Sequence, residues 1–127
     1  MKQTERPIAV FDSGVGGISV LVRLMPNENY IFFGDSKNAP YGGKSLEEVR
    51  KLTECHVRHL LSEGAKAVVI ACNTATSAAV ALLRKKYDIP IIGMEPAVKK
   101  AVDLYGNQKV LVCATPITVK GKKMLDL

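Results

Sequence analysis

Short apolar runs rich in β-branched residues alternate with longer amphipathic stretches along this chain. This alternation is typical of βα units, which assemble into a parallel sheet. It predicts five strands, at residues 8–11, 30–34, 67–71, 90–93 and 109–114. The predicted fold class is α/β, with flavodoxin-like βα units around a parallel sheet.

Helices are predicted between these strands, at residues 17–25, 45–63, 74–86 and 96–105. The second of them has the clearest boundaries. Ser45, with Glu48 three positions later, has the spacing of a capping box, and Gly64 supplies a C-terminal stop.

The two ends of the chain repeat one pattern, because residues 8–13 and 110–115 are both apolar runs that end in small polar residues. We therefore predict a first α/β domain at residues 1–97 and the start of a second, pseudo-symmetric domain at residues 98–127. Helices would then be missing from the layers that cover the sheets. We expect exposed apolar sheet surface and self-association, with a homodimer as one form.

The composition excludes several classes of protein. No segment approaches the roughly 18 to 20 consecutive apolar residues of a membrane helix, and residues 1–7 lack the apolar stretch of a signal peptide. The sequence thus predicts a cytoplasmic protein without a membrane partner. The cysteines Cys55, Cys72 and Cys113 are far apart and show no CxxC or histidine spacing, so neither a disulfide framework nor a metal site is predicted.

The net charge of +6 suits an anionic partner, but the basic residues are dispersed rather than gathered in one run. Few aromatic residues and the absence of a known nucleic-acid module argue against a nucleic-acid partner. A solvated basic surface, or steering of a small acidic substrate, accounts for the charge equally well.

The apolar run at residues 68–71 stops abruptly at Cys72, which is followed by Asn73 and Thr74. Ligands of open α/β sheets bind just beyond the carboxyl ends of buried strands, so Cys72 lies where chemistry is usually done. The alternative is a small buried hydrophobe, since free cysteine is among the most buried residue types. Position alone does not separate a catalytic thiol from a packed one.

A glycine-rich loop at residues 12–17 follows the first strand and precedes the first predicted helix. Its backbone N–H groups can form an anion-binding nest at a helix N-terminus, and the alternative is a tight turn. Asp12 and Ser13 at the strand end favour a site. A dinucleotide fingerprint is excluded, because its third glycine would fall at Ser19.

The polar loop at residues 35–43 follows the second strand. It is not a phosphate-binding P-loop, because Asn38 stands where that motif needs its first glycine. Tyr41 and Gly42 are placed to face the same cleft as Cys72. The alternative is an ordinary turn held by a proline and two glycines.

Cys55 and His56 are adjacent on a predicted helix, with His59 three residues further on. Neighbouring helical residues point in different directions, so Cys55 and His56 are poorly arranged as nucleophile and base. We interpret them as part of the surface or packing of the helix, rather than as a metal or Cys-His site.

Polar groups at four predicted strand ends should converge on one type of pocket. They are Asp12 and Ser13, Tyr41 and Gly42, Cys72 to Thr74, and Thr115 to Thr118. Hydroxyls, amides and backbone donors suit a small carboxylate. Asp12 would orient the Cys72 thiol or accept its proton.

Taken in order, these segments resemble the glutamate racemase family. The matching motifs are Asp-Ser-Gly-Val-Gly-Gly at 12–17, Gly-Asp-Ser at 34–36 with Ala-Pro-Tyr-Gly at 39–42, Ala-Cys-Asn-Thr-Ala-Thr at 71–76 and Ala-Thr-Pro-Ile-Thr-Val at 114–119. They span nearly the whole chain. The resemblance implies two pseudo-symmetric α/β domains with the active site between them. It also implies cofactor-independent interconversion of L- and D-glutamate, which supplies D-glutamate for bacterial peptidoglycan.

By this resemblance, Cys72 is one of two catalytic thiols. It would deprotonate D-glutamate and reprotonate the intermediate on the way back, assisted by Asp12. A free cysteine ionises near pH ~8.5, so Asp12 or the surrounding site must set the protonation state of Cys72. Donors around the substrate carboxylate would stabilise the developing carbanion. Substrate-binding roles are implied for Asp12, Ser13, Tyr41, Gly42, Asn73, Thr74, Thr115 and Thr118.

The chain also departs from the family pattern. The second catalytic cysteine belongs to a Gly-Cys-Thr-His motif, which these 127 residues lack, and neither Cys55 nor Cys113 has its context. By the resemblance, most of the second domain is absent, as is the C-terminal segment that returns to complete the first domain. We therefore expect the N-terminal portion of a racemase.

Three hypotheses follow from this departure. The chain holds half of a racemase site that needs the missing half for turnover, or it is a noncatalytic fragment that binds glutamate weakly or associates with another chain. The third is a related amino-acid racemase or decarboxylase of the same superfamily. Cys72, Asn73 and Thr74, together with the glycine-rich loop, favour the glutamate enzyme over the third hypothesis.

Overall fold

The computed structural model describes residues 2–126 of the chain. Within them, a parallel sheet is formed by the strands β1 (Ile8–Asp12), β2 (Tyr30–Gly34), β3 (Ala67–Ile70) and β4 (Ile91–Gly93). Their order across the sheet is β2-β1-β3-β4, and every neighbouring pair is parallel. The predicted α/β class is confirmed, and the strand order begins as it does in flavodoxin-like folds.

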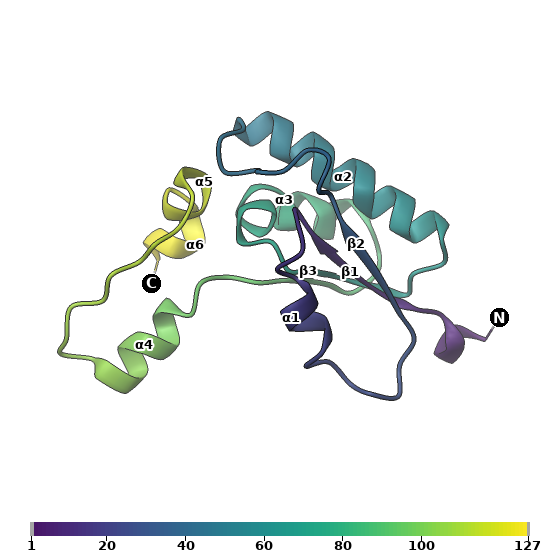
Figure 1. The fold of residues 1–127 in the computed structure, drawn as a ribbon, viewed down its shortest axis with the longest axis horizontal. Helices are drawn as coiled ribbons and strands as arrows, with labels where there is room; N and C mark the ends of the chain where they lie inside the picture. Colours follow the sequence, from purple (N-terminus) through teal and green to yellow (C-terminus); the bar gives the residue numbers. More distant parts are fainter. Residues whose placement is uncertain (1, 127) are drawn as a thin grey trace.

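Helices connect the strands and cover the sheet (Figure 1). In chain order they are the 3-10 helix η1 (Gln3–Glu5) and the α-helices α1 (Ile18–Leu21), α2 (Leu46–Ser62), α3 (Asn73–Lys86), α4 (Val98–Tyr105), α5 (Pro116–Val119) and α6 (Lys122–Leu125). The long helices α2 and α3 lie on one face of the sheet, and the short α1 lies on the other (Figure 1). None of the helices among residues 2–126 has both the length and the apolar character that crossing a bilayer demands.

The boundaries of α2 follow from its local sequence. The Ser45 hydroxyl accepts the Glu48 N–H at 3.2 Å, and the Glu48 carboxylate accepts the Ser45 N–H at 2.8 Å. The predicted capping box is thus confirmed. Gly64 follows the helix with a φ of +92°, in the left-handed region that glycine adopts without strain.

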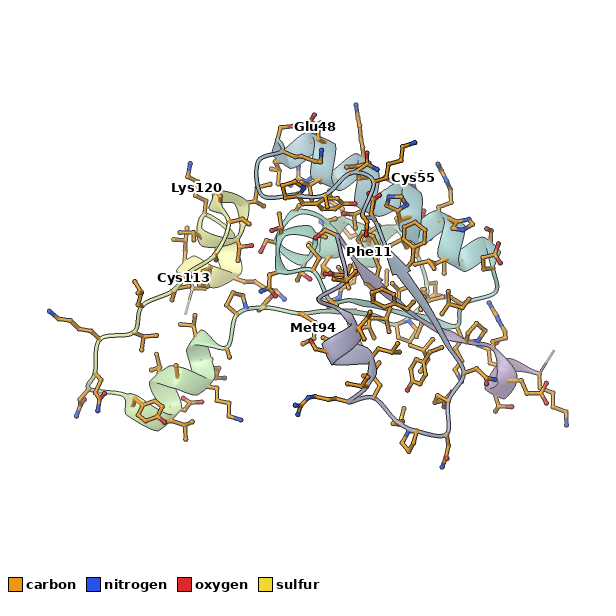
Figure 2. The ribbon with its side chains drawn as sticks, viewed as in Figure 1. Phe11, Glu48, Cys55, Met94, Cys113 and Lys120 are labelled. Carbon is orange, nitrogen blue, oxygen red and sulfur yellow. The ribbon has the colours of Figure 1, made fainter. Side chains whose placement is uncertain are left out.

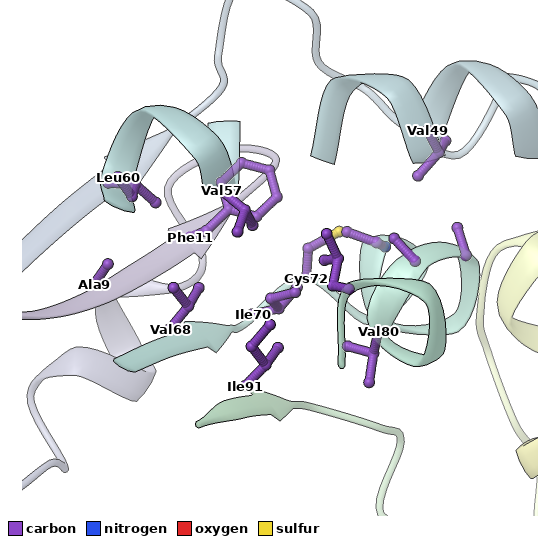
Figure 3. Packing of buried hydrophobic residues seen from close by; sticks show 14 of the residues in the cluster. Ala9, Phe11, Val49, Val57, Leu60, Val68, Ile70, Cys72, Val80 and Ile91 are labelled. Atoms are coloured by element: carbon purple, nitrogen blue, oxygen red, sulfur yellow. The ribbon is translucent and has the colours of Figure 1, made fainter. Parts of the chain in front are cut away.

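The core lies between the sheet and the layer formed by α2 and α3. Phe11 and Ile70 of the sheet share one buried cluster with Val57 and Leu60 of α2 (Figure 3). Burying an apolar side chain of this size contributes about 1.5 to 3 kcal/mol relative to leaving it exposed. The cluster therefore fixes the strands whose carboxyl ends carry Asp12 and Cys72.

The opposite face of the sheet is covered less evenly. Val10, Val69 and Ile92 are register partners across β1, β3 and β4, and they alternate with the residues that face the core. Val10 and Val69 are buried, whereas Ile92 is 51% exposed. Apolar sheet surface is thus exposed toward β4, as the sequence led us to expect.

The predicted fifth strand, at residues 109–114, is wrong. This segment is neither helix nor strand, and Leu111 within it is 89% exposed. A strand exists only through hydrogen bonds to a neighbour, and no strand among residues 2–126 lies beside this one. An apolar pattern of this kind forms a strand only where a pairing partner is present.

The predicted helix at residues 17–25 is much shorter than expected, because α1 ends at Leu21. The N–H groups of Arg23 and Leu24 bond to carbonyls three residues back, so the chain tightens into turns. Pro26 follows, and the residue before a proline is biased away from helical dihedrals.

The chain leaves the sheet after β4 and later returns to pack against α3. An extended segment leads to α4, which lies away from the sheet, and a second extended segment leads back to α5 and α6 beside α3 (Figure 1). The packing of α5 on α3 brings Thr115 and Thr118 to the carboxyl end of the sheet.

Candidate active site

Asp12 organises the glycine-rich loop at the end of β1. It is 8% exposed, and its Oδ2 atom accepts the N–H of Gly14 at 3.1 Å and the N–H of Gly17 at 3.2 Å. A Cβ atom on Gly17 would lie 2.8 Å from the Asp12 Cβ and 3.0 Å from the Ala71 Cβ. The loop therefore needs glycine here so that it can pass between Asp12 and the end of β3.

Cys72 is the N-cap residue of α3, directly beyond β3. Its sulfur accepts the Ala75 N–H at 3.3 Å, and the residue is 6% exposed. The same arrangement directs the N–H groups of Asn73 and Thr74 toward the space beyond the strand end.

Three threonine hydroxyls connect α3 with the returning C-terminal segment. Thr74 Oγ1 lies 2.7 Å from Thr115 Oγ1, and Thr115 Oγ1 lies 3.2 Å from Thr118 Oγ1. Thr118 is 1% exposed. These bonds bring the fourth predicted group of polar residues to the neighbourhood of Cys72.

A cavity of about 490 Å³ lies at this edge of the sheet. Seven of the predicted site residues line it, namely Asp12, Ser13, Cys72, Asn73, Thr74, Thr115 and Thr118. A cavity of this size is large enough for a small amino acid. The structure thus brings together residues from three of the four predicted strand ends.

The remaining two predicted residues lie beside this cavity rather than in its lining. Tyr41 is 2% exposed, and its hydroxyl donates to Asp35 Oδ2 at 2.6 Å. Gly42 adjoins the cavity wall, because a Cβ atom on it would lie 2.9 Å from Thr115 Cγ2. The hydroxyl of Tyr41 is therefore committed to Asp35, and the backbone of this segment is what approaches Thr115.

Asp35 is the centre of a buried polar cluster that the sequence did not reveal. Besides the Tyr41 hydroxyl, it accepts Asn38 Nδ2 at 2.9 and 3.0 Å, and His56 Nε2 lies 2.8 Å from Oδ2. Burial by itself raises the pKa of Asp35, but the bonds from Tyr41, His56 and Asn38 outweigh it and hold that pKa below its usual value. The pKa of Tyr41 is raised, mainly because the side chain is buried. The hydrogen bond to Asp35 and the charges of Asp35, Cys72 and Asp12 raise it further.

The interpretation of Cys55 and His56 as surface and packing residues agrees with the structure. Cys55 is exposed on α2 (Figure 2). His56 packs against Phe11 and Phe33, with ring centroids 5.5 and 4.7 Å away, and these two phenyl rings also stack on each other. Within residues 2–126, no group of three or more candidate metal ligands comes together.

The predicted site set left out other residues of the cavity lining, among them Met94 and Cys113. Met94 follows β4, and Cys113 lies on the extended segment between α4 and α5 (Figure 2); both line the same cavity as Cys72. Met94 could have been found as the residue directly after a predicted strand end. Cys113 lies two residues before Thr115, so its place near the end of the predicted strand was the available signal.

Comparison with known proteins agrees with this arrangement. The family model for Asp/Glu/Hydantoin racemases matches residues 20–124. The chain belongs to this family. It is also 58% identical, over its whole length, to the glutamate racemase of Clostridium botulinum strain Alaska E43, of which it covers 51%. The predicted resemblance to glutamate racemases is confirmed, and the Asp/Glu/Hydantoin racemases are isomerases.

Solved structures of glutamate racemases share this fold. The enzyme from Thermus thermophilus, in complex with β-chloro-D-alanine, superposes with a TM-score of 0.83 at 43% identity over 98% of this chain and 49% of that one. The enzyme from Francisella tularensis, in complex with D-glutamate, gives a TM-score of 0.78 at 35% identity over 96% and 47%. The chain thus spans about half the length of the curated and solved relatives that it matches.

Proposed function

We propose that this chain carries one half of the proton-transfer site of a glutamate racemase. The observation that carries the proposal is the position of Cys72 at the N-terminus of α3, in the lining of the same cavity as Asp12, Asn73 and Thr74. The names of its relatives point to the same reaction and substrate.

The proposed chemistry is cofactor-independent and uses two thiols. The Cys72 thiolate removes the α-proton of D-glutamate and becomes a thiol, while the electron pair stays on the α-carbon. A second thiol on the opposite face then donates a proton to that carbon, which inverts the centre. By the family resemblance, this second thiol belongs to a Gly-Cys-Thr-His motif. In the reverse direction Cys72 donates the proton.

The other predicted residues hold the substrate in this proposal. Asp12 orients Cys72 and helps to set its charge, while N–H groups and hydroxyls around the cavity bind the carboxylates and the amino group. The proposed substrate-binding residues are Asp12, Ser13, Asn73, Thr74, Thr115 and Thr118 in the cavity lining, together with Tyr41 and Gly42, which lie beside it. Donors fixed by the glycine-rich loop and by α3 stabilise the developing carbanion without rearrangement.

The proposal extends to domains and cellular role. Residues 1–97 form the first domain, and residues 98–127 begin the second, with Thr115 and Thr118 contributed across the boundary. The separation of α4 from the sheet supports this division (Figure 1). The complete enzyme would work in the cytoplasm and supply D-glutamate for peptidoglycan.

The test is exchange of the α-proton of D- and L-glutamate in deuterated water, followed by NMR. We expect exchange with the wild-type chain and with Cys55→Ala, whose cysteine lies outside the cavity lining, and loss of exchange with Cys72→Ala. Cys113→Ala reports whether the other thiol in the cavity lining takes part. Equal exchange of aspartate would instead favour a related racemase.

The second candidate is a unit that binds glutamate without turnover. It is favoured by the coverage of only about half of each relative. A folded wild-type chain that shows no exchange, but whose Asn73 and Thr74 amide resonances shift on titration with glutamate, would establish it. Neither exchange nor binding would overturn both proposals.

A further inference from the structure

The carboxylate of Asp35 connects α2 to the edge of the candidate site. Asp35 is 4% exposed, and its backbone N–H donates to the Asp12 carbonyl at 3.0 Å. On its other side it accepts the Tyr41 hydroxyl. A movement of Asp35 would therefore be transmitted both to the loop that carries Asp12 and to the segment that carries Tyr41.

His56 holds this carboxylate from α2. Its Nε2 lies 2.8 Å from Asp35 Oδ2, and its ring packs against both Phe11 and Phe33. Packing against both phenyl rings restrains the imidazole, so its hydrogen bond holds the Asp35 carboxylate in a defined orientation. Hydrogen bonds to an ionised carboxylate are also among the stronger hydrogen bonds in proteins.

Tyr41 connects Asp35 to the cavity wall. Its side chain is buried and bonded to Asp35, and the next residue, Gly42, approaches Thr115 so closely that a Cβ atom would lie 2.9 Å from the Thr115 methyl carbon. Thr115 lines the cavity and shares a hydrogen bond with Thr74. The path from α2 to the site is therefore continuous.

We propose that His56 is a positioning residue for substrate binding, which acts through Asp35 and Tyr41 to set where the Gly42 backbone lies against Thr115. This inference rests on the proposed function, in which Tyr41 and Gly42 bind the substrate. His56 does not itself line the cavity, and its effect is on the geometry of the binding edge.

The test compares three variants of the chain by NMR. His56→Phe keeps an aromatic ring against Phe11 and Phe33 but removes the hydrogen-bond donor. His56→Gln restores an N–H donor at a similar reach. His59→Gln is the matched control, because His59 is exposed on the same helix and contacts Phe33 only through a ring edge.

We expect His56→Phe to shift the Gly42 amide and Thr115 methyl resonances and to weaken D-glutamate binding by about tenfold, the loss of roughly one net hydrogen bond. His56→Gln and His59→Gln should resemble the wild type. Unchanged Gly42 and Thr115 resonances in folded His56→Phe, or equal changes in His59→Gln, would overturn the proposal.

Two further measurements keep the outcome decisive. If His56→Phe does not fold, Asp35→Asn interrupts the same path, and unchanged resonances in that variant overturn the inference. If the wild-type chain binds no glutamate, the proposed function fails for this chain. The resonances of the ligand-free variants then still decide whether His56 positions Gly42.

Discussion

The hydroxyl oxygens of Thr74 and Thr115 lie 2.7 Å apart, although 41 positions separate them in the sequence. Thr74 lies in the first turn of α3, and Thr115 is the residue that precedes α5. Their hydrogen bond joins the segment that carries Cys72 to the segment that returns from α4. It is a direct side-chain connection between the two proposed domains.

Replacing Thr115 with valine should loosen this connection. Valine has nearly the same shape but no hydroxyl, so the Thr74 and Thr118 oxygens lose their shared partner. We expect a loss of about 1 to 2 kcal/mol in the free energy of unfolding, measured by urea denaturation. Thr4→Val, at an exposed position, is the control and should change little. Equal stability of the two variants would mean that the bond is not formed in solution.

The lowered pKa of Asp35 predicts a specific loss of stability in acid. The folded pKa lies below the reference value of 3.8, so the stabilisation is complete above that pH and is lost as the pH falls through the folded pKa. Thermal melts should show a steeper decline in acid for the wild type than for Asp35→Asn. Asp88→Asn, at an exposed position, should keep the wild-type slope. Parallel profiles for wild type and Asp35→Asn would contradict the prediction.

Tyr41 should be the last of the four tyrosines to ionise. Its folded pKa is raised above the reference value of 10.0, so its stabilisation is complete below that pH and is lost as the pH rises beyond it. Ultraviolet titration should show one tyrosinate signal at higher pH than the others. Tyr41→Phe should remove this late signal, whereas Tyr105→Phe, an exposed position, should not.

Gly34 should tolerate no side chain. A Cβ atom there would lie 2.2 Å from the Gly14 carbonyl oxygen, which belongs to the backbone of the glycine-rich loop and cannot simply rotate away. We expect Gly34→Ala to destabilise the fold by about 3 kcal/mol or more, as measured by denaturant unfolding. Gly43→Ala is the matched control, since no atom lies within 4 Å of its added Cβ. A mild effect at Gly34 would show that the loop can shift.

The exposed apolar residues around α4 should promote self-association. Leu111 is 89% exposed, Leu104 63% and Tyr105 58%. Exposed apolar surface of this kind favours contact with other molecules. Sedimentation velocity should show oligomers whose fraction falls in Leu111→Lys more than in Val22→Lys, a control at an exposed residue near α1. A monodisperse wild-type monomer would contradict the expectation.

Much of the candidate site could be predicted from the sequence because its residues follow strand ends. In a parallel sheet the carboxyl ends of all strands lie at one edge, so Asp12 and Cys72 had to lie at the same edge once their strands were identified. The pairing of β1 with β3 then makes them neighbours. The helix boundaries at Ser45 and Gly64 could also be predicted, since caps depend on residues only a few positions apart.

Other features depended on tertiary contacts. Residues 109–114 have a strand pattern, but strand formation needs a hydrogen-bonding neighbour that the pattern does not contain. The Tyr41 hydroxyl donates to Asp35 and does not line the cavity, and His56 of α2 contacts the same carboxylate. Side-chain direction and long-range pairing are set by packing, which a linear sequence does not display. The sequence therefore determined which chemical groups reach the sheet edge, and the tertiary structure decided which of them face the cavity and which hold the others in place.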